Sequence, residues 1–253
     1  SLDVTHFNTA NVTDMSRMFS GCSSLTSLDV THFNTANVTN MSYMFFSCSS
    51  LTSLDVTHFN TANVTNMNSM FSSCSSLTSL DVTHFNTENV TDMSLMFNSC
   101  SSLTSLYLTN FNTENVTNMG RMFERCSSLT SLDLSHLNTA KVLSMTKMFK
   151  ECKSLKTLDL SGFDTRGKTC TMGDMFNTCN ELTTIFVSDK FAVGTGNTGD
   201  GTMFRGCNKL KGANALDKNN PQTGIDNANY KTGYFTKLVG KNGDEKIGAT
   251  GET

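Results

Sequence analysis

The apolar residues of this chain recur in a unit of 26 residues, and each unit contains two different patterns. In residues 51–76, Leu51, Leu54 and Val56 form an L-x-x-L-x-V run that suits a short strand. The apolar residues that follow are spaced three, three, one and three apart, and they are Val64, Met67, Met70, Phe71 and Cys74. This second spacing is typical of one helical face, so each unit is predicted to contain a short strand and about two turns of helix.

The period continues along most of the chain. One column of leucines contains Leu2, Leu28, Leu54, Leu80, Leu106, Leu132 and Leu158. A strand and a short helix cannot bury their apolar faces alone, so successive units must stack to form a common core. Strands are expected at residues 25–30, 51–56, 77–82, 103–108, 129–134, 155–160 and 182–187. They should pair in parallel, because each crossover returns the chain one layer further on. The predicted fold class is therefore α/β, a solenoid of about eight units.

The division into domains follows the loss of this regularity. Residues 1–207 are predicted to form the solenoid, which begins within a unit and is expected to be truncated at its N-terminus. Loops such as 193–201 are expected late in the chain, where most glycines and Pro221 lie. Residues 208–240 are interpreted as an irregular C-terminal cap. The small, polar and glycine-rich residues 241–253 are interpreted as a flexible tail or linker.

The predicted helices have matching start signals. The pairs are Thr13-Asp14, Thr39-Asn40, Thr65-Asn66, Thr91-Asp92 and Thr117-Asn118. Their side chains are expected to accept hydrogen bonds from the free amides of a helix N-terminus.

Charge excludes some partners. The net charge is -3, but residues 1–138 carry ten acidic and three basic side chains, whereas residues 139–253 carry sixteen basic and twelve acidic ones. No basic run with interleaved aromatic residues occurs, so nucleic-acid binding is not expected. No apolar stretch approaches the roughly 18 residues of a membrane span, and no leader segment is recognisable. The oligomeric state is left open.

The strand pattern L-x-x-L-x-V followed by V-T-N-M-x-x-M-F-x-x-C-S-S resembles the BspA-like leucine-rich-repeat surface proteins of bacteria. The resemblance covers about Leu2 to Leu210, and Asn229 to Lys237 resembles the ending of such arrays. It implies a leucine-rich-repeat solenoid, an extracellular location on a bacterial cell surface, and a host or neighbouring-cell protein or glycan as partner. The chain departs from the common pattern where Phe33 and its equivalents replace the usual Asn, so a horseshoe curvature is not assumed.

The cysteines are predicted to be buried thiols. One cysteine occurs per unit, at Cys22, Cys48, Cys74, Cys100, Cys126 and Cys152. Stacked units roughly 5 Å apart would hold the Cβ atoms farther apart than the ~3.8 Å of a disulfide. A disulfide of Cys170 with Cys179 or Cys207 is left open, and the Cys and His spacings support no metal site.

All five histidines, His6, His32, His58, His84 and His136, follow the repeat. They are expected to form an exposed row at a strand-to-loop corner. If the row acts as a pH switch, protonated imidazoles would repel one another, and the protein would melt at a lower temperature at pH 5 than at pH 7.5.

The candidate binding site is a row on the outward side of the strands, and its members are Asp29, Asp55, Asp81, Tyr107, Asp133 and Asp159. The simplest interpretation is that charge keeps a polar sheet soluble. The alternative is a strip that binds a cationic or hydroxyl-rich partner, with Tyr107 as an aromatic anchor. Neighbouring carboxylates are expected to raise one another's pKa and attract cations, although one carboxylate per layer suits calcium poorly.

Other repeated polar residues are interpreted as structural. The Asn-Thr pairs from Asn8-Thr9 to Asn138-Thr139 are expected to satisfy backbone groups in turns, and all fifteen methionines are assigned to the core. Asn11, Asn37, Asn63, Asn89 and Asn115 each begin an Asn-Val-Thr glycosylation motif. One column varies in every unit, and its members are Arg17, Tyr43, Ser69, Leu95, Arg121 and Lys147. Such variation suits an unselected surface and suits a specificity site equally well.

No catalytic constellation stands apart from the repeat, so an enzyme is not expected and no cofactor is assigned. The favoured function is a noncatalytic, adhesin-like binding module that presents a Thr/Ser/Asp sheet face to protein or glycan partners. The alternative is a passive spacer that holds another domain away from the cell surface. Ice binding is a third class, suggested by stacked threonines and disfavoured by the aspartates on the same face.

Overall fold

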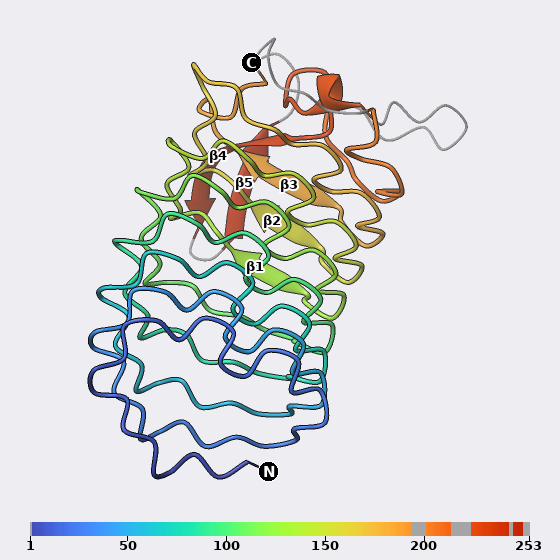
Figure 1. Cartoon of the computed structure of the whole chain (residues 1–253). Helices are drawn as coiled ribbons and strands as arrows, with labels where there is room; N and C mark the ends of the chain where they lie inside the picture. Colours follow the sequence, from blue (N-terminus) through green and yellow to red (C-terminus); the bar gives the residue numbers. More distant parts are fainter. Residues whose placement is uncertain (1, 194–200, 214–223, 243–244, 250–253) are drawn as a thin grey trace.

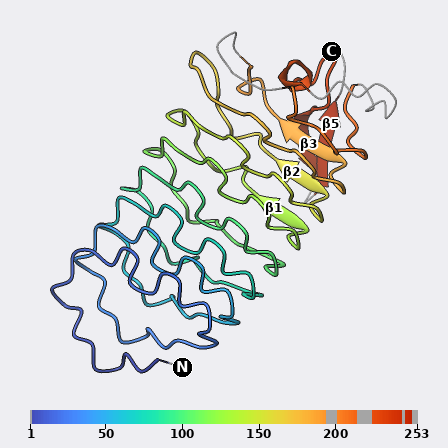
Figure 2. The same ribbon diagram turned by 45° about the vertical axis from the view of Figure 1, so that its right-hand side comes forward.

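The computed structural model describes residues 2–193, 201–213, 224–242 and 245–249. Successive units form layers that stack along one axis, with the N-terminal layers at one end and the labelled strands toward the other (Figures 1 and 2). The predicted loop 193–201 and Pro221 fall almost entirely outside the described residues. The described chain consists mostly of turns and of segments without regular secondary structure, joined by short strands and isolated bridges.

The continuous strands lie in the C-terminal half. Among the described residues they are β1 (Ser131–Asp133), β2 (Thr157–Asp159), β3 (Thr184–Val187), β4 (Thr236–Asn242) and β5 (Glu245–Ala249), and one 3₁₀-helix, η1, covers Ile225–Asn227. The sheet order is β1-β2-β3-β4-β5, parallel up to β4 and antiparallel between β4 and β5. Leu132 pairs with Leu158, and Leu158 pairs with Ile185. The predicted parallel stacking of equivalent leucines is confirmed here.

The predicted strands of the earlier units are not formed as continuous strands. Leu2 and Leu28 make an isolated parallel bridge. The backbone nitrogen of Thr52 lies 3.5 Å from the carbonyl oxygen of Thr26, whereas the equivalent distance from Thr183 to Lys156 is 2.9 Å. The layers are therefore farther apart on the strand side in the N-terminal half, and the ladder is too weak there to form a regular sheet.

The predicted helices are wrong, because the described residues contain no α-helix. In residues 66–76 the chain makes consecutive turns, and its amides alternate between two kinds of acceptor. The amide of Phe71 donates to the carbonyl of Met96 in the next layer at 3.0 Å, and the amide of Met70 donates to Met67 within its own turn at 3.2 Å. A helix would direct these bonds to residues four positions earlier in the same layer.

Positive φ angles explain why this segment cannot be helical. Ser69 has φ 55° and Ser73 has φ 62°, and the equivalent residues of every unit up to residues 171–181 also have a positive φ. A left-handed residue at every fourth position closes each turn and still directs residues three and four apart to the same side. We call the segments 14–24, 40–50, 66–76, 92–102, 118–128, 144–154, 171–181 and 202–209 the turn ladder.

The core is one continuous column of apolar side chains. Its centre is a stack of parallel phenylalanine rings whose neighbouring centroids lie 5.6–5.9 Å apart, with planes inclined by 2–10°. The rings belong to Phe19, Phe45, Phe71, Phe97, Phe123, Phe149, Phe176 and Phe204. Fourteen methionines are buried and Met18 is partly buried against this core, which confirms their assignment.

Two aromatic residues end the stack. The ring of Phe235 stands nearly perpendicular to Phe204 at 5.8 Å, and Tyr234 packs edge-on against the same ring at 5.2 Å. Residues 241–253 were predicted to be a flexible tail, but the described part of this segment forms strands. Residues 241–242 complete β4 and residues 245–249 form β5, because their backbone groups pair with each other across the hairpin.

Candidate functional site

The strand face consists of the outward side chains of residues 25–32 and of the equivalent residues in other units. The carboxylates of Asp29, Asp55, Asp81 and Asp133 are exposed on it, as predicted from the sequence. Tyr107 lies between the last two, and 65% of its surface is exposed. Five of the six predicted site residues therefore share one open surface.

Asp159 does not belong to this surface. It is fully buried, and it pairs in register with Phe186 of β3. Phe186 is itself nearly covered, because β5 approaches so closely that a Cβ at Gly248 would collide with Phe186 and Thr236. The C-terminal sheet therefore closes over the sixth member of the predicted row, and the open row ends at Asp133.

Shallow hollows flank Tyr107 on both sides. One, of about 260 Å³, is lined by Ser79, Leu80, Asp81, Thr83, Ser105 and Tyr107. The other, of about 250 Å³, extends from Tyr107 past Leu132 and Asp133 to Asp159. Both have leucine floors and polar rims, so a bound group would meet apolar surface beside hydroxyls and carboxylates.

The exposed carboxylates are held by local turns. Oδ1 of Asp81 accepts hydrogen bonds from the Thr83 hydroxyl at 2.6 Å and from the Thr83 amide at 2.9 Å, and Asp29 and Asp55 are bonded in the same way. The Thr83 hydroxyl and amide lower the pKa of Asp81, and they outweigh the opposing effect of Asp55. The neighbouring carboxylate does raise the pKa of Asp81, as expected for such a row, but the net shift is downward because hydrogen bonding to the charged form dominates.

The histidine row is exposed at the corner beside these turns. Nε2 of His136 lies 2.8 Å from the carbonyl oxygen of Leu108, and Asn110 at the equivalent position donates to the carbonyl of Thr83 at 2.6 Å. The pH switch stays a prediction. Among the residues that the structure describes, no three His, Cys, Asp or Glu side chains are grouped so as to hold a metal ion.

The cysteine thiols were predicted to be buried, and the structure confirms this. The described chain has no disulfide, and the cysteines other than the partly buried Cys22 are buried. The Cys100 thiol donates to the carbonyl of Phe71 in the preceding layer at 3.2 Å, and Cys48, Cys74, Cys126 and Cys152 make the same bond. Burial raises the pKa of Cys48 to about 11 and that of Cys100 to about 12. These cysteines are therefore inert structural donors.

The repeated Asn-Thr pairs are structural, as predicted. The buried Thr87 hydroxyl donates to the carbonyl of Asn112 at 2.9 Å and accepts from the Asn112 amide at 2.8 Å. The side chain of Asn112 accepts from the amide of Glu114 two residues later. The Asn37 and Asn63 side chains of the glycosylation motif donate to carbonyls of the preceding layer at 2.8 Å.

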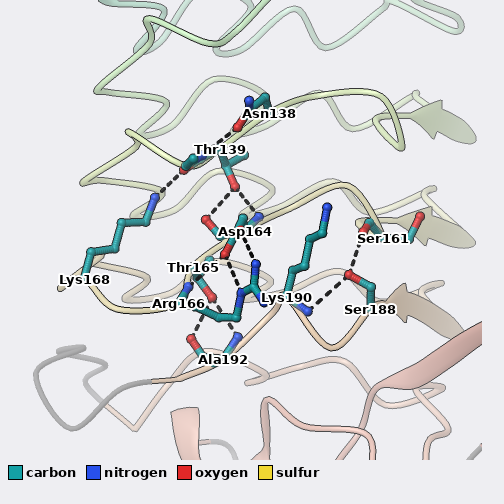
Figure 3. A network of polar contacts seen from close by, with 11 residues as sticks. Asn138, Thr139, Ser161, Asp164, Thr165, Arg166, Lys168, Ser188, Lys190 and Ala192 are labelled. Atoms are coloured by element: carbon teal, nitrogen blue, oxygen red, sulfur yellow. Dashed lines mark hydrogen bonds and ion pairs between the residues drawn. The ribbon is translucent and has the colours of Figure 1, made fainter.

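The same corner changes its chemistry toward the C-terminus (Figure 3). Asp164 replaces the asparagine of earlier units and accepts two hydrogen bonds from the Arg166 guanidinium, at 3.0 and 2.7 Å. These bonds lower the pKa of Asp164 to about 2. We call the column of buried threonines from Thr9 to Thr165, whose hydroxyls donate to carbonyls of the next layer, the threonine ladder. It continues here, because the Thr139 hydroxyl accepts from the amide of Asp164, and Lys168 donates to the carbonyl of Thr139.

Sequence reasoning missed the conformation of the variable column. Arg17, Tyr43, Leu95, Arg121 and Lys147 all have φ between 56° and 59°. The signal was present in the absence of a normal helix C-terminus in each unit, but a helical spacing of apolar residues concealed it.

The described residues contain no helix with the length and apolar character that a membrane crossing requires.

A comparison with curated proteins gives no match. A family model matches the chain twice, over residues 1–80 and 74–189, as expected for a repeated unit. These matches cover most of the chain, which therefore belongs to the family described as "Mycoplasma protein of unknown function, DUF285".

Proposed function

We propose that this chain is a noncatalytic binding module of a bacterial surface protein of the BspA-like type. It presents the strand face, centred on Tyr107, to a protein or glycan on a host or a neighbouring cell. The repeated unit and the family match support a repeat surface protein, and the location outside the cell follows from the resemblance.

The exposure of Tyr107 carries this proposal. Every exposed neighbour in its column is an aspartate, and a stacked fold that needed only solubility would retain that charge. An aromatic side chain with 65% of its surface exposed, between two hollows with leucine floors, supplies contact area at small entropic cost. The fixed carboxylates on either side orient polar groups of a partner.

Binding to a panel of matrix proteins and glycans tests the proposal. The Tyr107→Asp variant completes the aspartate column without changing the fold. We expect it to lower the affinity for the bound partner by roughly tenfold or more, because central aromatic residues dominate such interfaces. Surface plasmon resonance of the whole chain measures the change.

Leu143→Asp is the matched control. Leu143 is also an exposed large side chain, at 55%, but it lies in a different column. The variant introduces the same charge and should bind as the unmodified chain does. Equal losses in both variants would contradict the assignment of the strand face. If the unmodified chain binds no member of the panel, the passive spacer becomes the better explanation.

A further inference from the structure

The amino-acid sequence of the repeated unit varies at a position of the turn ladder and hardly varies on the strand face. The strand face repeats almost without change, whereas the column Arg17, Tyr43, Ser69, Leu95, Arg121, Lys147 and Asp174 differs between neighbours throughout. Every one of these residues has a positive φ, between 55° and 59°.

A positive φ disfavours every residue that has a Cβ atom, because the Cβ approaches the following carbonyl oxygen. Glycine occupies such backbone at no steric cost, and asparagine and aspartate tolerate it, so drift without selection would favour those three residues. The column contains only one of them, Asp174, and no glycine or asparagine. Gly21 and Gly206 do occur in the second positive-φ column of the same turns. Long side chains at Arg121 and Lys147 are therefore retained against a backbone preference, which points to an external role.

The outward charge of the turn ladder is positive in its C-terminal half. Among its described residues from 118 to 209, seven are basic and four are acidic. Each acidic residue is paired with a basic one and is the less exposed partner. Side-chain exposure is 6% for Glu124 against 48% for Arg121, and 26% for Glu151 against 58% for Arg125. The same order holds for Asp174 with Lys150 and for Glu181 with Lys209.

A groove runs along the turn ladder into this basic surface. Its volume is about 520 Å³, and its walls are serines of successive layers, including Ser75, Ser101 and Ser127, followed by Arg125, Glu151 and Lys153. The lining is hydroxyl-rich and has no large apolar residue, unlike the centre of a protein interface. No exposed aromatic residue lines it on which a nucleic-acid base could stack.

We propose that the turn ladder binds a linear anionic polysaccharide, with sulfate or carboxylate groups on Arg121, Arg125, Lys147 and Lys153 and the sugar chain along the serine groove. The partner must be extended, because the cations follow one another layer by layer. This surface is separate from the strand face, so its binding does not depend on the function proposed for Tyr107.

Affinity for immobilised heparin and hyaluronan, measured with the whole chain, tests this. Heparin represents sulfated chains, hyaluronan represents carboxylated ones, and neutral dextran is the negative control. Lys153→Glu should weaken binding roughly tenfold, because it places a negative charge beside the anionic chain. Lys156→Glu is the matched control, since Lys156 is equally an exposed lysine but lies on the strand side. It should change the affinity by less than about twofold.

Lys147→Gly separates binding from folding. Glycine relieves the positive φ of 58°, so the melting temperature should not fall, while the affinity for the polysaccharide should fall several-fold. Unchanged affinity in this variant would overturn the proposal. Equal losses of affinity in Lys153→Glu and Lys156→Glu would also overturn it, as would a lack of binding to either polysaccharide. Tighter binding of polyglutamate or of single-stranded DNA than of both polysaccharides would overturn it as well.

Discussion

One buried cysteine per layer illustrates, at the scale of a residue, what stacking demands of a side chain. The position must be small and apolar enough for the core and must also satisfy the carbonyl of the preceding layer. A thiol meets both conditions, because it behaves as a small hydrophobe with a weak donor. The bond from Cys100 to Phe71 shows that the repeated cysteine is a structural link between layers.

These thiols predict a loss of stability at high pH. Burial raises the folded-state pKa of Cys48 to about 11 and those of Cys100 and Cys152 to about 12, above the ordinary value of 9.0. The unfolded chain therefore loses its thiol protons first. The stabilisation is complete below about pH 9 and disappears as the pH rises toward 11–12.

Chemical denaturation between pH 8 and pH 10 measures this effect. In Cys100→Ala the free energy of unfolding should fall less steeply, by up to about 1.4 kcal/mol per pH unit. An identical slope in the two proteins would show that Cys100 ionises equally in both states.

The exposed aspartates give a second prediction at this scale. The Thr83 hydroxyl and amide lower the pKa of Asp81 from 3.8. Thr83→Val removes the hydroxyl, so the pKa of Asp81 should rise, and carbon-detected NMR titration reports it directly. Asp55, whose Thr57 is unchanged, is the internal control. A pKa of Asp81 above 3.8 in the unmodified protein would instead indicate that repulsion along the row dominates.

At the scale of an element, the turn ladder replaces the helix that the apolar spacing favours. Both conformations bury residues three and four apart, but they send backbone amides in different directions. In the turns, the amides of Met67, Ser69 and Phe71 reach the next layer. Amides that would donate within a helix therefore donate to the next layer, and these hydrogen bonds hold the layers together.

The threonine ladder is a second element that links the layers. Thr87→Val preserves shape but leaves the amide and carbonyl of Asn112 without the hydroxyl that bonds both of them. We expect a loss of about 2–4 kcal/mol in the free energy of unfolding, since each buried unsatisfied group costs about 1–3 kcal/mol. Urea denaturation measures the loss.

Thr104→Val is the comparison for this experiment. Thr104 is exposed on the strand face, and its substitution should change stability by less than about 0.5 kcal/mol. Similar effects of the two substitutions would refute a special role for the ladder.

At the scale of the whole molecule, the stacked phenylalanines make each layer depend on its neighbours. Stability in such an array is approximately a sum of terms between nearest neighbours, so the ends decide where unfolding begins. Tyr234 and Phe235 cover the last ring of the stack at the C-terminal end.

Phe235→Ala should therefore loosen the molecule from one end. We expect a loss of about 3–5 kcal/mol, because a fully buried aromatic side chain is removed. Hydrogen exchange should show protection lost first in residues 171–193 and 201–210 and retained around residues 51–76. Phe7→Ala is the control, since 49% of Phe7 is exposed. Uniform loss of protection along the chain would mean that the array unfolds as one unit.

Much of this organisation was determined by the sequence alone. The 26-residue period predicts stacked layers, parallel pairing, a methionine and phenylalanine core and one buried thiol per unit, because any fold that repeats must place equivalent residues in equivalent positions. The exposure of Asp29, Asp55, Asp81 and Tyr107 follows from the same periodicity. The family resemblance adds the expectation of a surface protein.

The tertiary structure decided what periodicity cannot distinguish. A spacing of three and four is shared by a helix and by turns with a left-handed residue, and the sign of φ and the direction of the amides separate them. Asp159 occupies the same position of the repeat as its exposed equivalents, yet the sheet from β3 to β5 buries it. Contacts from residues far along the chain set both outcomes, since burial and hydrogen-bond partners belong to the assembled layers and to no single unit.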